Sequence, residues 1–163
     1  MGKKSVKAEA EDSMDTSTVA TTTIVPATDK DEYNALTAVC NEISQPMAGR
    51  KLAKKIYKLL KHVGKDKNTV SVGLAAVMKS LRKGEEGVVI LAGNVWPIDM
   101  YSHIPGICEE KNIPYVYTPS REHLGLALGY NRPCIVVLIK NTKFSSEQFD
   151  ELSEACKELD AQF

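Results

Sequence analysis

Apolar and polar residues follow two different spacings along the chain from about residue 31 onward. Continuous apolar runs bounded by glycine, proline or polar residues indicate strands that are covered on both faces. Elsewhere apolar residues recur every three or four positions, which predicts amphipathic helices. The predicted strands are 87–93, 114–118 and 134–140, and the predicted helices are 31–44, 48–63, 69–83, 97–111 with a break near Pro105, 120–129 and 145–161.

The order of these segments predicts the architecture. Strands alternating with helices of about ten to fifteen residues are typical of α/β proteins. We therefore expect a three-layer α/β/α sandwich around a small mixed sheet, formed by a single domain over residues 31–163. Residues 1–30 are rich in Thr, Ser, Ala and acidic residues without hydrophobic periodicity, so we expect a disordered acidic tail. Ser145 and Gln148 form a predicted capping box at the last helix.

Two of the predicted helices carry a basic outer face. The helix over 48–63 buries Leu52, Ile56, Leu59, Leu60 and Val63 and exposes Lys51, Lys54, Lys55, Lys58 and Lys61. The next helix, capped by Asn68 or Thr69 and ended by Gly84, buries Val70, Leu74, Val77, Met78 and Leu81 and exposes Ala75, Lys79 and Arg82. These lysines could simply be a solvated helix face, or they could attract a polyanion.

Charge is strongly segregated along the chain although the formal net charge is zero. Residues 46–83 carry a formal charge of +10, whereas residues 1–45, 84–143 and 144–163 carry −4, −1 and −5. A basic block of this size is the expected footprint of a phosphate-bearing partner or, less commonly, of an acidic protein.

Enzymatic, metal-binding and membrane-spanning patterns are missing from the sequence. The four cysteines are far apart, without C-x-x-C or a Cys/His cluster, so we expect reduced, mostly buried thiols. Asp99, Ser102 and His103 are neighbours in sequence but form no recognisable catalytic arrangement, and His62 and His123 are expected on helix surfaces. No apolar stretch is long enough to span a membrane, and no phosphate-binding glycine motif follows a strand.

The segment from Lys83 to Val137 resembles a known family. "KGE", "LAG", "HIPGICEEKNIPYVY", "PSREHLG" and "RP" follow one another as in the small α/β/α proteins that recognise kink-turns in RNA. This resemblance covers about residues 46–141, and "RKLAKKIYKLLK" and "PIDMYSHIPGICEE" are most similar to family members in box H/ACA guide-RNA particles. It implies a non-catalytic scaffold without a cofactor, monomeric within a nuclear, nucleolar particle. Its implied partners are the H/ACA guide RNA, the pseudouridine synthase catalytic subunit and the other H/ACA core proteins.

The resemblance also implies which residues contact RNA. A glycine that lets the RNA backbone approach closely corresponds to Gly73, beside Leu74, and a phosphate-binding lysine corresponds to Lys79, with Arg82 on the same face. Trp96, the only tryptophan, is at a further RNA-side position, where it could stack on a base or plug the edge of the domain. The loop and strand start that contact a splayed nucleotide correspond to Tyr130, Asn131, Arg132 and Ile135.

Four positions depart from the family pattern. Val72 replaces a basic residue, Ala75 an Asn or Lys, Ala76 a guanine-reading Glu, and Asn94 a common Asp. Phosphate attraction depends on charge, whereas base discrimination depends on side-chain hydrogen bonds. We therefore expect RNA binding with weakened kink-turn specificity. Two alternatives stay open at this point: a ribosomal or spliceosomal kink-turn protein, and a protein-interaction module whose Lys-rich helix binds an acidic partner.

Overall fold

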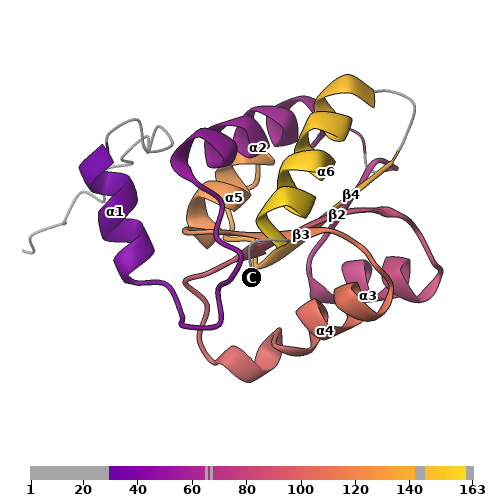
Figure 1. Ribbon diagram of the computed structural model, residues 1–163, viewed down its shortest axis with the longest axis horizontal. Coiled ribbons are helices and arrows are strands. Elements are labelled where there is room, and N and C mark those ends of the chain that lie inside the picture. Colours follow the sequence, from indigo (N-terminus) through magenta and orange to yellow (C-terminus); the bar gives the residue numbers. More distant parts are fainter. Residues whose placement is uncertain (1–29, 65, 67, 142–145, 161–163) are drawn as a thin grey trace, which may run out of the picture.

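The computed structural model describes residues 30–64, 66, 68–141 and 146–160 (Figure 1). Residues 1–29 of the predicted tail lie outside the described residues, and so does Ser145 of the predicted capping box. The side chain of Gln148, its predicted partner, is not described either. The elements are α1 (Lys30–Ala38), α2 (Arg50–Val63), β1 (Val70–Val72), α3 (Leu74–Arg82), β2 (Gly87–Ala92), the 3-10 helix η1 (Ile98–Met100), α4 (His103–Glu110), β3 (Tyr115–Thr118), α5 (Arg121–Ala127), β4 (Val136–Lys140) and α6 (Ser146–Asp160).

A four-stranded mixed sheet forms the middle layer, in the order β1-β4-β2-β3. β2 and β3 are parallel, and β4 is antiparallel to both of its neighbours, β1 and β2. Ile90 in β2 lies opposite Val116 on one side and Val137 on the other. All six residues of β2 are buried, as expected for a central strand with helices on both faces.

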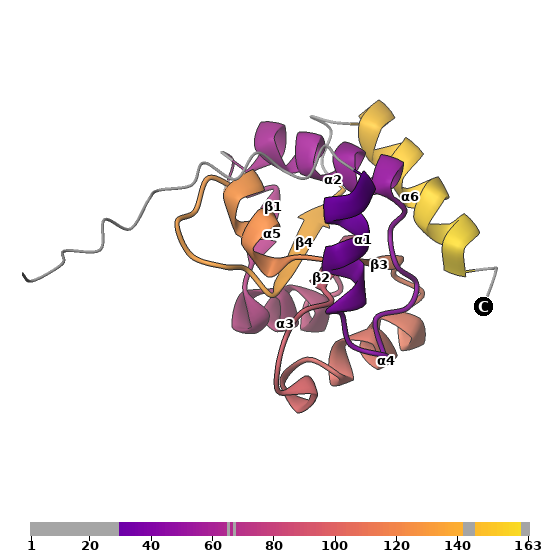
Figure 2. The ribbon, with the colours of Figure 1, turned by 90° about the vertical axis from the view of Figure 1, so that its left-hand side faces the viewer.

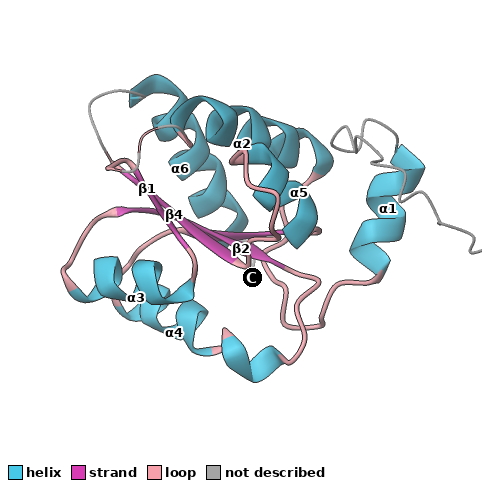
Figure 3. Cartoon of the chain, turned by 180° about the vertical axis from the view of Figure 1, so that it is seen from behind, coloured by secondary structure: helices cyan, strands magenta, loops and turns pink. Residues whose placement is uncertain are grey.

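The helices form the two outer layers. α2, α5 and α6 cover one face of the sheet, and α3 and α4 cover the other (Figure 3). α1 stands beside the sandwich (Figure 1), where the Tyr33 hydroxyl donates a hydrogen bond to the Ala48 carbonyl. The predicted α/β/α sandwich with a mixed sheet is therefore confirmed.

The second basic helix begins later than predicted. Residues 70–72 form β1, paired with Val137–Ile139 of β4, and α3 begins only at Leu74. Two β-branched valines in this segment suit a strand, and Gly73 has a positive φ of 89° that a helix cannot continue through. Val70 is buried in β1 and lies four residues before Leu74. Buried residues of a helix have the same spacing, so the sequence pattern places Val70 in the helix.

Two further helix boundaries differ from the prediction. The helix over 97–111 is broken at Tyr101–Ser102, and Pro105 lies in the first turn of α4, where a proline costs no intrahelical hydrogen bond. α1 ends at Ala38, so Val39 and Ile43 are exposed instead of lying on a packed helical stripe.

The mixed topology brings several loops to one edge of the sheet. Because β4 runs against β1 and β2, its amino end lies beside their carboxyl ends, and β3 is parallel to β2. The α3 amino terminus, the loop after β2, the α5 amino terminus and the loop before β4 therefore meet at this edge.

Candidate nucleic-acid interface

Backbone hydrogen bonds join the predicted RNA-contacting segments at the sheet edge. The Gly73 amide donates to the Val136 carbonyl at 3.0 Å, and the Ala92 amide donates to the Ile135 carbonyl at 2.9 Å. The turn before α3, the loop before β4 and the loop after β2 are thereby held next to one another. Gly73 and Ile135, which are 62 positions apart in sequence, thus belong to one surface.

The amino terminus of α3 is open and lacks a side-chain cap. Gly73 occupies the N-cap position with φ 89° and ψ 156°, and a Cβ atom added there would meet nothing within 4 Å. Ala75 and Ala76 are exposed in the first turn, which contains no acidic residue. Amide groups in a first helical turn attract anions, and small neighbouring side chains leave them accessible. This end of α3 is suited to close approach by a phosphate, although it offers no side chain that could read a base.

The loop before β4 presents its polar side chains to solvent while its backbone is fixed. Tyr130, Asn131 and Arg132 are exposed and, with Val72 and Cys134, line a hollow of about 430 Å³. The Tyr130 amide donates to the Gly125 carbonyl at 3.0 Å, and the Cys134 amide donates to the Arg121 carbonyl at 3.1 Å.

Gly125 allows this loop to lie directly on α5. A Cβ atom at Gly125 would stand 2.3 Å from the Arg132 carbonyl oxygen, so a side chain there would displace the loop. Burial raises the pKa of the Cys134 thiol, which lies beneath the hollow and stays protonated at neutral pH.

The loop after β2 is tied to α5 by a polar network around Glu122. The Asn94 side-chain amide donates to Glu122 Oε2 at 3.0 Å, Ser120 Oγ donates to the same oxygen at 3.0 Å, and Arg121 Nε lies 2.9 Å from Oε1. Burial alone would raise the pKa of Glu122, but these hydrogen bonds outweigh it and lower the pKa to about 2. Asn94 therefore holds two segments of the edge together, since its Oδ1 also accepts the Arg121 amide at 2.9 Å.

The remaining predicted residues lie at different distances from this edge. Trp96 is 69% exposed, which rules out the interpretation that it plugs the domain. Leu74 and Ile135 are half-buried and pack against the core. Lys79 and Arg82 are exposed on α3, but they lie about 7.5 and 12 Å along its axis from Leu74. The edge thus gathers most of the predicted residues, and the two cations extend the surface along α3.

The basic block seen in the sequence is divided between two faces of the molecule. α2 lies on one side of the sheet and α3 on the other (Figure 3), so the basic residues of the two helices belong to different layers of the sandwich. Lys55 of α2 forms an ion pair with Glu151 of α6 at 3.1 Å. The negative charge of α6 therefore partly compensates the positive charge of α2. The two helices are far apart in sequence, so the sequence alone does not reveal this pairing.

His123 is buried, contrary to the prediction of a surface position. It is 7% exposed and its ring makes an edge-to-face contact with Tyr57, with centroids 6.2 Å apart. Burial lowers the pKa of His123, which favours the neutral ring. His62 is exposed as predicted. None of the four cysteines forms a disulfide and three of them are buried, in agreement with the predicted thiols.

Residues 54–149 match the model of the Ribosomal protein L7Ae/L30e/S12e/Gadd45 family. The chain belongs to this family. Within this L7Ae family, the chain is 51% identical over 162 residues to an H/ACA ribonucleoprotein complex subunit 2-like protein of Caenorhabditis elegans, covering 98% of this chain and 97% of the relative. It is 42% identical over 159 residues to H/ACA ribonucleoprotein complex subunit 2 of Drosophila melanogaster, covering 98% of both chains.

A solved L7Ae-like structure supports the same relationship. The Giardia lamblia 15.5kD RNA binding protein is 28% identical, with a TM-score of 0.68 over 73% of this chain and 98% of that chain. The chain is therefore a homologue of H/ACA ribonucleoprotein complex subunit 2, in a family of non-catalytic RNA-binding proteins. This confirms the family resemblance and the expectation of a non-enzymatic protein.

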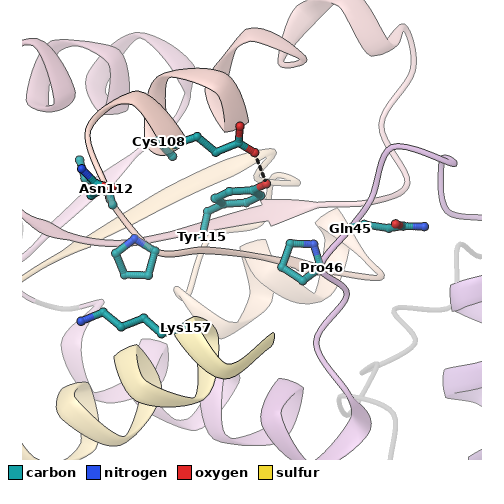
Figure 4. A pocket seen from close by; sticks show the side chains of 9 residues that line it. Gln45, Pro46, Cys108, Asn112, Tyr115 and Lys157 are labelled. Carbon is teal, nitrogen blue, oxygen red and sulfur yellow. Dashed lines mark hydrogen bonds between the residues drawn. The ribbon is translucent and has the colours of Figure 1, made fainter. Parts of the chain in front are cut away.

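A second hollow of this L7Ae-family protein lies at the opposite end of the sheet. It measures about 660 Å³ and is lined by Pro46, Cys108, Tyr115 and Lys157, among others (Figure 4). The Tyr115 hydroxyl donates to Glu109 Oε1 at 2.8 Å. Because it borders the amino end of β3, this hollow is separate from the edge that carries Gly73 and Arg132. Within the described ranges, no His, Cys, Asp and Glu side chains gather as a metal site, and no helix could cross a membrane.

Proposed function

We propose that this chain is a non-catalytic RNA-binding scaffold subunit of a box H/ACA small nucleolar ribonucleoprotein. In that role it would support guide-directed pseudouridine formation in ribosomal RNA and ribosome biogenesis, in the nucleolus. Its partners would be the guide RNA, the pseudouridine synthase subunit and the other core proteins. The relationship to H/ACA ribonucleoprotein complex subunit 2 over nearly the whole chain supports this assignment.

The RNA surface consists of the α3 amino terminus, the outer face of α3 and the loop before β4. Its residues are Gly73, Leu74, Lys79, Arg82, Tyr130, Asn131, Arg132 and Ile135, with Trp96 at its margin. The irregular bend of a kink-turn is the kind of shape that proteins read in RNA, because the A-form major groove is too narrow for side chains. The open helix end and the exposed cations supply contacts to the phosphate backbone.

The exposed pair Ala75–Ala76 is the observation that carries the proposed weak specificity. Both side chains face solvent at the helix end that would meet the RNA, and neither can form a hydrogen bond. Bidentate contacts to base edges discriminate by roughly 1–3 kcal/mol in the DNA complexes where they have been analysed. Without them, binding depends mainly on charge and backbone shape, so the protein reaches its particle in part through protein partners.

The test compares affinities for a kink-turn and for a duplex of equal length. We expect a preference below about a hundredfold, which corresponds to roughly 2.7 kcal/mol. The variant Ala75→Asn with Ala76→Glu restores the missing side chains and is expected to increase the kink-turn preference. Titrations of labelled RNA at fixed salt measure both values. A wild-type preference well above a hundredfold would contradict weak specificity.

A further inference from the structure

Most of the exposed large hydrophobic side chains are gathered around one buried asparagine. In the part of the chain that the structure describes, six such side chains are exposed, and four of them are within two residues of Asn41 or of its hydrogen-bond partners. The four are Val39 (67% exposed), Ile43 (40%), Trp96 (69%) and Met100 (44%). Scattered exposed hydrophobic residues are normal, whereas a group of them commonly marks an interaction site.

Asn41 fixes the relative positions of two segments that are distant in sequence. Its backbone amide donates to the Gly93 carbonyl at 2.9 Å, and its side-chain amide donates to the Val95 carbonyl at 2.6 Å and the Tyr101 hydroxyl at 2.9 Å. Val39 and Ile43 are each two residues from Asn41, so their Cα atoms lie within about 7 Å of it. Trp96 directly follows Val95, and Met100 directly precedes Tyr101.

The two segments are also in close van der Waals contact. A Cβ atom added at Gly93 would lie 2.9 Å from Cys40 Sγ and 3.0 Å from Ser44 Oγ. The chain between α1 and α2 accordingly runs beside the loop that leads from β2 to η1 (Figures 1 and 2). These contacts thus fix the backbone of both segments that carry the exposed side chains.

The two chain segments that carry this group have a charge opposite to that of the proposed RNA surface. Residues 39–45 and 93–102 contain no Lys or Arg, and their charged residues are Glu42 and Asp99. Both carboxylate side chains belong to exposed residues. Carboxylates repel the phosphates of a polynucleotide, whereas they attract Lys or Arg side chains on a protein.

We propose that Val39, Ile43, Trp96 and Met100 form a docking surface, the Asn41 patch, for a protein partner. The partner presents apolar side chains flanked by Lys or Arg, which meet Glu42 and Asp99. Tryptophan and methionine are enriched at protein interfaces, and exposed tryptophan is a common energetic anchor. The inference rests on the proposed function, in which the partner is another subunit of the same particle. It assigns Trp96, at the margin of the RNA surface, to a contact with the protein partner.

The test measures incorporation into a particle reconstituted from guide RNA and the other H/ACA core subunits. The double variant Val39→Ser with Ile43→Ser is expected to lower incorporation at least tenfold while its affinity for free RNA stays within twofold of wild type. Glu42→Lys, which reverses one carboxylate, is expected to lower incorporation as well. Leu126→Ser, an exposed hydrophobic position on α5, is the matched control and should incorporate normally. Thermal unfolding of each variant checks that the fold is intact.

The outcomes separate this inference from the function on which it rests. Unchanged incorporation of the double variant overturns the Asn41 patch, and so does an equal loss of affinity for free RNA, which would place the patch in the RNA interface. If wild type joins the particle without measurable affinity for RNA, the RNA-binding function fails. The patch is still supported in that case, provided that the double variant loses incorporation.

Discussion

Gly73 combines a backbone conformation that other residues rarely adopt with an unobstructed surface. Its φ of 89° and ψ of 156° are essentially restricted to glycine, yet a side chain at this position would touch nothing. Glycine is therefore required by the backbone conformation and by the proposed close approach of RNA, and not by crowding from neighbouring residues. A side chain here would strain the turn between β1 and α3 and occupy open space through which an RNA backbone would approach.

Replacing Gly73 with alanine tests both consequences. Gly73→Ala should lower the free energy of unfolding by about 1–3 kcal/mol and weaken RNA binding. Urea denaturation measures the first effect, and RNA titration of the folded variant measures the second. Gly106→Ala is the matched control. Gly106 lies inside α4 with open space around it, so alanine there should raise the free energy of unfolding by about 0.5–1 kcal/mol. Unchanged stability of Gly73→Ala would refute the strain argument.

The sequence predicts the burial or exposure of a residue well where it follows from the local pattern, and poorly where it depends on distant segments. The exposed positions of Ala75, Lys79 and Arg82 follow from the stripe on the opposite side of their helix. The burial of His123 does not, because it depends on Tyr57 of a different helix. The support of the Trp96 loop by Asn41 is likewise invisible in sequence, since 52 positions separate Asn41 from Gly93.

α5 begins with a serine whose side chain caps the helix. Ser120 is buried, its Oγ accepts the His123 amide at 3.2 Å, and the same hydroxyl donates to Glu122. The cap thus joins the helix start to the network that includes Asn94 of the neighbouring loop. Ser102, at the start of α4, makes no comparable side-chain hydrogen bond.

This contrast gives a paired prediction at the two helix starts. Ser120→Ala should lower the free energy of unfolding by about 1 kcal/mol, because an N-cap hydrogen bond is lost. Ser102→Ala should change it by less than about 0.5 kcal/mol. Chemical denaturation of both variants, with equal slopes required, provides the comparison. Equal effects at the two positions would show that the Ser120 cap adds little.

The sequence predicts the long elements and misses the short one. Three strands and the amphipathic helices have enough residues for a periodic signal, and all of them are present. β1 has three residues, and its valines are spaced so that they also extend the helical stripe of α3. Its identity depends on pairing with β4, which is more than sixty positions further along the chain. Because the pattern does not reveal β1, the sequence prediction places Gly73 inside a helix.

At the scale of the whole molecule, charge is distributed differently from its order in the sequence. The basic block is divided between α2 and α3 on opposite faces, and Glu151 of α6 pairs with Lys55 of α2. This arrangement weakens the alternative in which the Lys-rich helix binds an acidic partner, since Glu151 of α6 already pairs with one lysine of α2. The cations of the proposed RNA surface are those of α3 and of the loop before β4.

The salt dependence of RNA binding should therefore follow the α3 edge. Lys79→Ala and Arg132→Ala should each weaken binding to kink-turn and duplex RNA alike and reduce the slope of log affinity against log salt by about 1. Lys157→Ala, on α6, should leave the slope unchanged and is the control. Titrations at several salt concentrations measure these slopes. A change in the preference between the two RNAs would argue against a purely phosphate role for Lys79 and Arg132.

The exposure of Trp96 has a practical consequence. With one indole in the chain, the ultraviolet emission of the unlabelled protein comes chiefly from a single point at the junction of the two proposed surfaces. A wavelength shift or quenching of this emission during a titration with RNA or with a protein partner would therefore show which of the two covers Trp96. The measurement needs no dye.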